Sequence, residues 1–242
     1  VKLRPVKGFV EKLRLVKDED EIALIREAGA ITASAFRSVL GEMRSGRSEQ
    51  EIAALLEYFM RRQGSGPVAF ETIVASGERG ALPHGTASQK MIERGELVTM
   101  DLGATYQGYA ADLTRTICVG TISAKQREVY EIVREAQERG IGAVRSGVSV
   151  SQVDSEARNF LAEAGYEDYF VHSLGHGVGL SVHEEPRIAQ QEDLALQPGM
   201  VITIEPGVYI PRWGGVRIED TVLVREGGCE ILTPVTKDLV VV

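Results

Sequence analysis

Two aspartates interrupt segments that otherwise have the pattern of half-buried β-strands. The stretch VTMDLGATYQGYAADLTRT, residues 98–116, reads as a strand pair with Asp101 before its turn and Asp112 after it. A buried carboxylate is costly unless a cation or hydrogen-bond donors compensate its charge. If residues 105–108 form the turn, the two aspartates lie opposite each other and point to one face. The fold must therefore compensate two neighbouring negative charges.

A second strand pair near the carboxyl end has the same arrangement. In VITIEPGVYIPRWGGVRIEDTVLV, residues 201–224, Glu205 and Glu219 flank a turn near Arg212. Taken singly, each acid has a simpler explanation: an edge or turn position for either aspartate, a loop position for Glu205, and a solvent-facing pair with Arg217 for Glu219. The symmetric placement in both hairpins argues against these explanations. Four carboxylates facing one interior repel one another, and divalent cations would neutralise them.

The histidines add nitrogen ligands to this set. The chain has only four, and His172, His176 and His183 fall within YFVHSLGHGVGLSVHEEP, while His84 stands alone in ALPHGTAS. A single histidine more often packs than binds a metal, and a tight turn would explain the neighbouring glycines. One imidazole with four carboxylates nevertheless suits Mn, Co, Fe(II) or Zn, and acids able to bridge imply two ions. Such a pair activates water and polarises a carbonyl, which is hydrolytic chemistry.

Composition narrows the class of protein. The 242 residues are 43% hydrophobic and 26% charged, as in ordinary globular domains, and no apolar run is long enough for a membrane span. A net charge of −8 argues against nucleic-acid binding, which requires clustered Lys and Arg. Cys118 and Cys229 stand in separate strand-like contexts and are expected to pack in the core. Without a secretion signal, the chain is expected to be cytoplasmic; because it begins with Val, we expect a processed or excised piece.

The chain also repeats an order of elements. SGRSEQEIAALLEYFMRRQG and SGVSVSQVDSEARNFLAEAG share an SGxS opening and a closing glycine at one constant offset. Because serine and glycine are common at helix ends, this match alone could arise by chance. The expected elements are helices over 18–40, 47–64, 123–145 and 149–165, a strand and loop over 70–85, and strand pairs over 98–116 and 199–225.

The motifs resemble a known family. DLGATYQGYAADLTRT, HSLGHGVGLSVHEEP, IEPGVYI and VRIEDTVLV occur in the order found in pita-bread metallopeptidases: methionine aminopeptidases, aminopeptidase P and Xaa-Pro dipeptidase (prolidase). The resemblance implies an α+β fold of two pseudo-symmetric halves, with a curved antiparallel sheet and outer helices. It also implies two divalent metal ions, Mn or Co in the first place and Fe or Zn as alternatives. The implied metal ligands are Asp101, Asp112, His176, Glu205 and Glu219.

The same resemblance assigns roles to these ligands. Asp112 and Glu219 match the acids that bridge the two ions, Asp101 matches a ligand of one ion, and His176 and Glu205 match ligands of the other. Glu205 also matches the residue that relays the proton of the metal-bound water.

Other residues indicate the subgroup. His84 and His183 match the family histidines that contact substrate and stabilise the tetrahedral intermediate. His172 matches no ligand, so packing is expected for it. Arg217, Tyr209 and the PRWGG turn resemble prolidase and aminopeptidase P more than methionine aminopeptidase. Arg217 is expected to orient Tyr209 or an acid ligand.

The resulting prediction is a dinuclear-metal hydrolase that cleaves between an N-terminal residue and proline by a metal-bound hydroxide, acting as an Xaa-Pro dipeptidase or aminopeptidase. The alternatives are a methionine aminopeptidase, a pita-bread binding module without catalysis, and a metal-free creatine-hydrolysing relative; the intact ligand set argues against the last two. Residues 1–16 are expected to be a linker remnant from an amino-terminal domain, and 17–242 the catalytic domain. The expected partner is a peptide with proline second, with no nucleic acid and no membrane, and a homodimer stays open.

Overall fold

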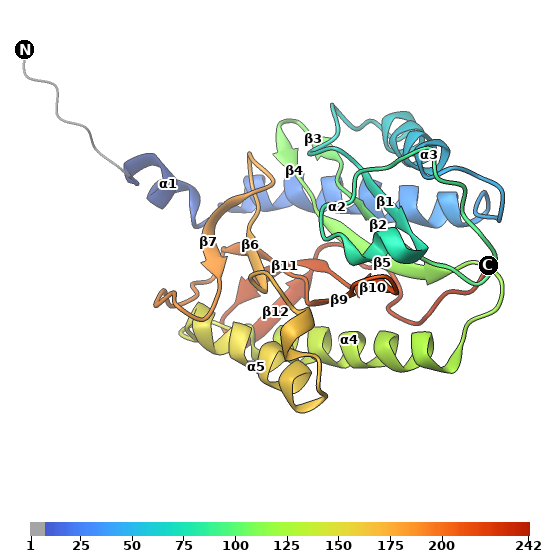
Figure 1. Cartoon of the computed structure of the whole chain (residues 1–242). Helices are drawn as coiled ribbons and strands as arrows, with labels where there is room; N and C mark the ends of the chain where they lie inside the picture. Colours follow the sequence, from blue (N-terminus) through green and yellow to red (C-terminus); the bar gives the residue numbers. More distant parts are fainter. Residues whose placement is uncertain (1–7) are drawn as a thin grey trace, which may run out of the picture.

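The computed structural model describes residues 8–242, so residues 1–7 of the expected linker lie outside the described part (Figure 1). The helices are α1 (Phe9–Arg14), α2 (Glu19–Leu40), α3 (Glu49–Arg62), α4 (Ala124–Ala143) and α5 (Val150–Glu163), with 3₁₀ turns at Gly77–Ala81 and Glu167–Tyr169. The strands are β1 (Ile73–Ser76), β2 (Leu97–Leu102), β3 (Thr105–Tyr106), β4 (Tyr109–Ala110), β5 (Leu113–Cys118), β6 (Gly175–Gly177), β7 (Glu184–Ile188), β8 (Val201–Ile204), β9 (Gly207–Ile210), β10 (Gly214–Arg217), β11 (Asp220–Arg225) and β12 (Gly228–Ile231).

The four long helices begin where their sequences predict. Asp18, Ser48, Ser123 and Ser149 each accept a hydrogen bond from a backbone amide three residues on, and the side chain there bonds back to the cap. This reciprocal capping satisfies two amides that a helix start otherwise leaves unpaired. The predictions for α2 to α5 are confirmed. Helix α1 lies within residues 1–16, which were expected to be a linker remnant, and it was not predicted.

The repeat in the sequence corresponds to a repeat in the backbone. Gly46 and Gly147 both have positive φ, 87° and 83°, as do Gly64 and Gly165 at 94° and 83°. Each pair therefore uses the left-handed conformation that glycine adopts without strain. Helices α3 and α5, which lie between these glycines, are both 14 residues long. The two-half organisation is thus visible in matched caps and turns.

The strands lie between the two helix pairs (Figure 1). In the first half, β1, β2 and β5 form a three-stranded antiparallel sheet, and in the second half β12, β11, β8, β6 and β7 form a five-stranded one. Helices α2 and α3 pack with the first sheet, around Phe36, Leu56 and Met100, and α4 and α5 pack with the second. Strands β6, β7 and β12 were not predicted. Within residues 8–242 there is no helix with the length and apolarity to cross a membrane.

Candidate metal centre

Asp101 and Asp112 meet at the end of the first strand pair. Asp101 lies in β2 opposite Thr114 of β5, two residues beyond Asp112, so the prediction that the aspartates lie directly opposite each other was wrong. The turn is centred on Gln107 and Gly108, which both have positive φ, as in the two-residue turns that fit a twisted strand pair. A shift of two residues keeps both aspartates on one face, because side chains alternate with period two. The shared face was correctly predicted.

Glu205 and Glu219 meet at the end of the second strand pair. The pairings Ile204 with Asp220 and Arg217 with Gly207 have one register, which places Glu205 opposite Glu219. The turn contains Arg212 with a positive φ of 62°, as expected. Both hairpins therefore deliver two acids to the same interior.

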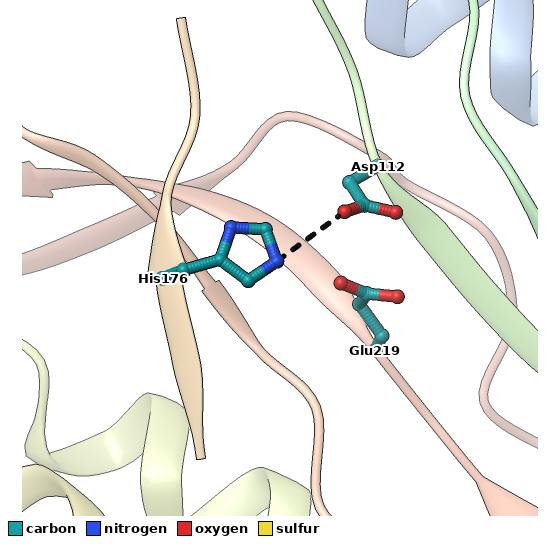
Figure 2. Close-up of side chains that lie close together, drawn as sticks. All are labelled: Asp112, His176 and Glu219. Carbon is teal, nitrogen blue, oxygen red and sulfur yellow. Dashed lines mark ion pairs between the residues drawn. The ribbon is translucent and has the colours of Figure 1, made fainter. Parts of the chain in front are cut away.

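His176 lies between the acids from the two hairpins. Its Nε2 atom is 3.6 Å from Asp112 Oδ2 and 3.3 Å from Glu205 Oε1. Figure 2 shows the imidazole of β6 pointing toward Asp112, which precedes β5, and Glu219, which precedes β11. One ligand atom from each of Asp112, His176 and Glu219 lies within 4.8 Å of the others. This spacing leaves room for a cation among them.

The hydrogen bonding of these acids is incomplete. Asp101 Oδ1, Asp112 Oδ1 and Glu219 Oε1 are buried without a hydrogen-bond partner, three of the five such side-chain atoms among residues 8–242. Buried polar groups are normally paired, so three orphaned oxygens in one place require an explanation. Oxygen donors with one imidazole are what hard or borderline divalent ions prefer. The residues therefore fit a metal ion.

Burial and mutual repulsion shift the acids away from their ordinary titration. Burial raises the pKa of Asp112 and Glu219 well above the usual range, and the charges of the neighbouring acids add to this. Burial also raises the pKa of Asp101, although Arg217 opposes it. Burial would raise the pKa of Glu205 too, but the hydrogen bond and charge of His176 lower it to about 2. Without a cation, the centre holds protons that a metal ion would displace.

Arg217 connects the acids to a surrounding layer of hydrogen-bonded residues, which includes Tyr209 and Thr114. It is buried and donates from Nη2 to Asp101 at 2.7 Å, from Nη1 to the Tyr209 hydroxyl at 2.9 Å and from Nε to the Thr114 hydroxyl at 3.1 Å. Thr114 in turn donates to Glu219 Oε2 at 2.6 Å. These bonds are the contacts that the prediction for Arg217 requires, and among residues 8–242 Arg217 makes no ion pair with Glu219.

His172 belongs to this layer, although it was expected only to pack. The Tyr209 hydroxyl, which already accepts from Arg217, lies 2.9 Å from His172 Nε2 and can donate to it. His172 Nδ1 lies 2.7 Å from the Ser173 carbonyl oxygen, and burial lowers the pKa of the ring. A neutral imidazole with its proton on Nδ1 satisfies all of these contacts.

The acids open onto a cavity of about 520 Å³ whose walls carry the remaining histidines. His84 projects from residues 82–88, the His84 loop, and His183 ends residues 178–183, the His183 loop. The His183 ring packs edge-on against His176, with centroids 4.4 Å apart. Both histidines lie on the cavity wall, but their roles toward substrate stay predictions.

Arg187 and Glu184 also line the cavity and were not found from the sequence. Arg187 of β7 pairs across the strands with His176 and therefore lies on the same face. It makes no ion pair or side-chain hydrogen bond with any described residue. Glu184, beside His183, is buried under two cations from the chain start. Alternation from His183 along HEEPRI could have indicated Arg187, whereas nothing local indicated the partners of Glu184.

A protein-family comparison decides the class. The description "Metallopeptidase family M24" matches residues 23–226. The chain belongs to metallopeptidase family M24. Membership implies divalent metal ions, in agreement with the orphaned oxygens of the acids.

Individual members of family M24 are similar to nearly the whole chain in sequence and in structure. The Xaa-Pro dipeptidase of Pyrococcus furiosus is 51% identical over 236 residues, which cover 98% of this chain and 68% of the relative. The solved prolidase from Pyrococcus furiosus superposes with a TM-score of 0.94 at 52% identity, covering 96% of this chain and 68% of that one. The X-Pro aminopeptidase from Thermotoga maritima gives 0.96 at 48%, covering 98% and 67%. The predicted pita-bread fold is confirmed.

Proposed function

We propose that this M24 chain hydrolyses the peptide bond between an amino-terminal residue and proline, and that it acts as an Xaa-Pro dipeptidase. The support for proline comes from the relatives, of which the Pyrococcus furiosus enzyme is named for this activity at 51% identity. The support for metal-dependent hydrolysis is one structural observation. Three buried carboxylate oxygens beside a cavity lack any partner among the described residues, and a divalent cation would satisfy and neutralise all three together.

We assign the metal site to Asp101, Asp112, His176, Glu205 and Glu219, with Mn or Co as the preferred ions and Fe or Zn as alternatives. Bound ions would lower the pKa of a coordinated water toward neutrality and polarise the scissile carbonyl. Residues 17–242 are assigned as the catalytic domain. A homodimer and a cytoplasmic location stay predictions.

Glu205 is the proton carrier in this proposal. Glu205 lines the cavity beside His176, whose hydrogen bond and charge lower its pKa to about 2, so Glu205 is ionised at neutral pH and its position allows it to take up the proton of the attacking water. It then delivers the proton to the proline nitrogen as the peptide bond breaks. Proton transfer of this kind contributes a factor of about 10² to 10⁴ in rate.

His84 and His183 stabilise the negative charge that develops on the carbonyl oxygen. They reach the cavity from different halves of the molecule and both are exposed on its wall. Burial and the neighbouring His176 lower the pKa of His183, so it donates as a neutral imidazole. A preformed donor aimed at a developing oxyanion is worth about 10² to 10³ in rate.

Arg187 is the anchor for the carboxylate of a dipeptide. It lies on the cavity wall beside the His176 strand, and no described acid neutralises it. In an Xaa-Pro dipeptide, the proline after the scissile bond carries the free carboxylate. A cation near the metal site therefore selects dipeptides over longer peptides. This assignment favours the dipeptidase over the aminopeptidase.

The test compares substrates and variants on the Mn- and Co-loaded protein. Xaa-Pro dipeptides should be hydrolysed faster than Xaa-Pro-Xaa tripeptides, and Met-Gly-Xaa peptides least. Glu205→Gln should lower kcat by at least about 100-fold, and Arg187→Met should raise KM for dipeptides more than for tripeptides. Preference for Met-Gly-Xaa would instead identify a methionine aminopeptidase. Full activity of Glu205→Gln would refute the proton-carrier role.

A further inference from the structure

Glu184 lies next to His183 and is held by residues that precede the first long helix. Its side chain is only 6% exposed and pairs with Arg14 and with Lys17 Nζ, the latter at 3.3 Å. Lys17 is buried as well, with 2% of its side chain exposed. Burial lowers the pKa of Lys17, and the Glu184 charge opposes this shift. The buried Glu184 carboxylate and the buried Lys17 ammonium therefore neutralise each other.

The Glu184 carboxylate also shapes the His183 loop. It accepts a hydrogen bond from the Ser181 amide at 2.9 Å. A Cβ on Gly179 would lie 2.7 Å from Glu184 Oε2, so the backbone of the loop passes directly against the carboxylate. The loop is closed by a bond from the Gly179 amide to the Ser181 carbonyl at 3.0 Å, and the Ala110 amide donates to Gly179 at 2.8 Å.

The segment that supplies the cations is itself fixed to the second half. The Lys17 amide donates to the Gly199 carbonyl at 2.9 Å, and Val16 forms a bridge with Met200. A Cβ on Gly199 would lie 2.9 Å from the Lys17 carbonyl oxygen, which shows how closely the two backbones approach. Arg14 and Lys17 therefore act from a rigid base.

We propose that Glu184 is a positioning residue for His183, and that Arg14 and Lys17 hold it in place. The chain preceding α2 thereby sets the catalytic geometry of a loop more than 160 residues away, Lys17 and Glu184 being separated by 167. The inference rests on the proposed role of His183 in stabilising the intermediate. It gives residues 14–17 a function in catalysis beyond that of a linker.

The test is a double-mutant cycle on the Mn-loaded full chain. Lys17→Met keeps the length of the side chain and removes its charge, and it should lower kcat by about 10- to 100-fold, because a displacement near 1 Å can have that effect. KM should change much less, because the lost interaction belongs to the transition state. In a His183→Ala background, Lys17→Met should lower kcat less than about twofold further.

Two matched controls separate this from general damage. In a His84→Ala background, Lys17→Met should retain its full effect on kcat, because Glu184 contacts the His183 loop. Arg26→Met removes an ion pair of α2 with Glu230, at 2.8 Å and well exposed, and should leave kcat unchanged. Where Lys17→Met does not fold, Glu184→Gln enters the same cycle with the same expectations. Equal factors in the His183 and His84 backgrounds would overturn the proposal.

A structural readout stands apart from activity. Amide exchange over 178–183 should quicken in Lys17→Met, whereas exchange over 82–88 should not change. If the wild type cleaves no Xaa-Pro peptide, the proposed function fails while this measurement still decides whether Lys17 holds the loop. Unchanged exchange over 178–183 overturns the coupling even in an active enzyme.

Discussion

The two histidine loops are each held by one buried glutamate, but the two glutamates are held from different places. Glu49, the first residue of α3, accepts from the amide and hydroxyl of Ser76 at 2.8 and 2.9 Å and from those of Ser88 at 3.1 and 2.7 Å. It also pairs with Arg79, which donates to the Thr86 carbonyl at 2.8 Å. All of these residues belong to the first half.

The Glu184 carboxylate accepts fewer hydrogen bonds than that of Glu49, and its two cations come from outside its own half. Arg14 and Lys17 precede α2, and Arg14 keeps about a third of its side chain exposed, at 34%. The His84 loop is therefore fixed by its own half, whereas the His183 loop depends on the chain start. Two histidine loops on one cavity can thus have unequal structural support, and the predictions below test that inequality.

The largest expected effect is the loss of the Glu49 carboxylate. Glu49→Ala would remove the ion pair of Arg79 and leave four donors of Ser76 and Ser88 without their acceptor, and we expect it to lower the free energy of unfolding by about 3–5 kcal/mol. Glu184→Ala should cost about 2–3 kcal/mol, because Arg14 can turn toward solvent and Lys17, whose pKa is already lowered by burial, can lose its proton. Urea unfolding of both variants measures the difference. A larger loss for Glu184→Ala would reverse the comparison.

The removal of metal ions should have the second largest effect on stability. At free ion about 100-fold above its Kd, bound metal stabilises the folded state by about 2.7 kcal/mol, which chelation abolishes. The His183 loop should loosen more than the His84 loop, because His183 packs on the candidate ligand His176. Amide exchange with and without chelator measures this. Equal loosening of both loops would contradict it.

The pH dependence should differ in sign between the centre and the Glu184 contact. In the metal-free fold the pKa values of Asp112 and Glu219 are raised, so above about pH 4 the folded state binds more protons than the unfolded state. Stability of the metal-free protein should therefore fall as pH rises through this window. The pKa of Glu184 is lowered despite burial, through Ser181, Arg14 and Lys17, so its contribution is lost as pH falls.

Urea titrations of the metal-free protein from acid to neutral pH check both signs. Glu184→Gln should flatten the acid side of the curve only, whereas addition of Mn should reduce the decline toward neutral pH. A metal-free stability that rises steadily with pH would contradict the raised pKa values of the centre.

The smallest expected effect compares two serines. Ser88→Ala removes a hydroxyl that donates to Glu49 at 2.7 Å and should cost about 1 kcal/mol. Ser181→Ala should change stability by less than about 0.5 kcal/mol, because Ser181 holds Glu184 through its backbone amide. Thermal unfolding of the two variants resolves the difference, and equal losses would show that the Ser181 hydroxyl matters.

Local sequence signals predicted the features that depend only on residues close together in the sequence. Helices α2 to α5 followed from capping residues and apolar spacing, and the face shared by Asp101 and Asp112 followed from strand alternation. The register of their hairpin did not, because no local signal showed that Gln107, a non-glycine residue, adopts positive φ. Strand β6 was missed because its three residues, Gly175–Gly177, have no strand-like side-chain pattern.

Contacts between distant segments account for the other omissions. Nothing near Glu184 indicates partners at residues 14 and 17, and nothing near Glu49 indicates Ser76 and Ser88. The hydroxyl that bonds His172 likewise comes from Tyr209 on strand β9. Such groups can be recognised as buried and charged, but their partners require the three-dimensional fold.

The distance along the chain between the two acid hairpins has a consequence for the order of folding. Thr114 and Glu219, which are hydrogen-bonded across the centre, are 105 residues apart. Pairings of such long range form slowly, because the loop between them must be closed before they stabilise anything. Each half can therefore collapse on its own helices before the four acids converge. Repulsion among the ionised acids opposes this final docking, so a bound divalent ion is expected to favour it.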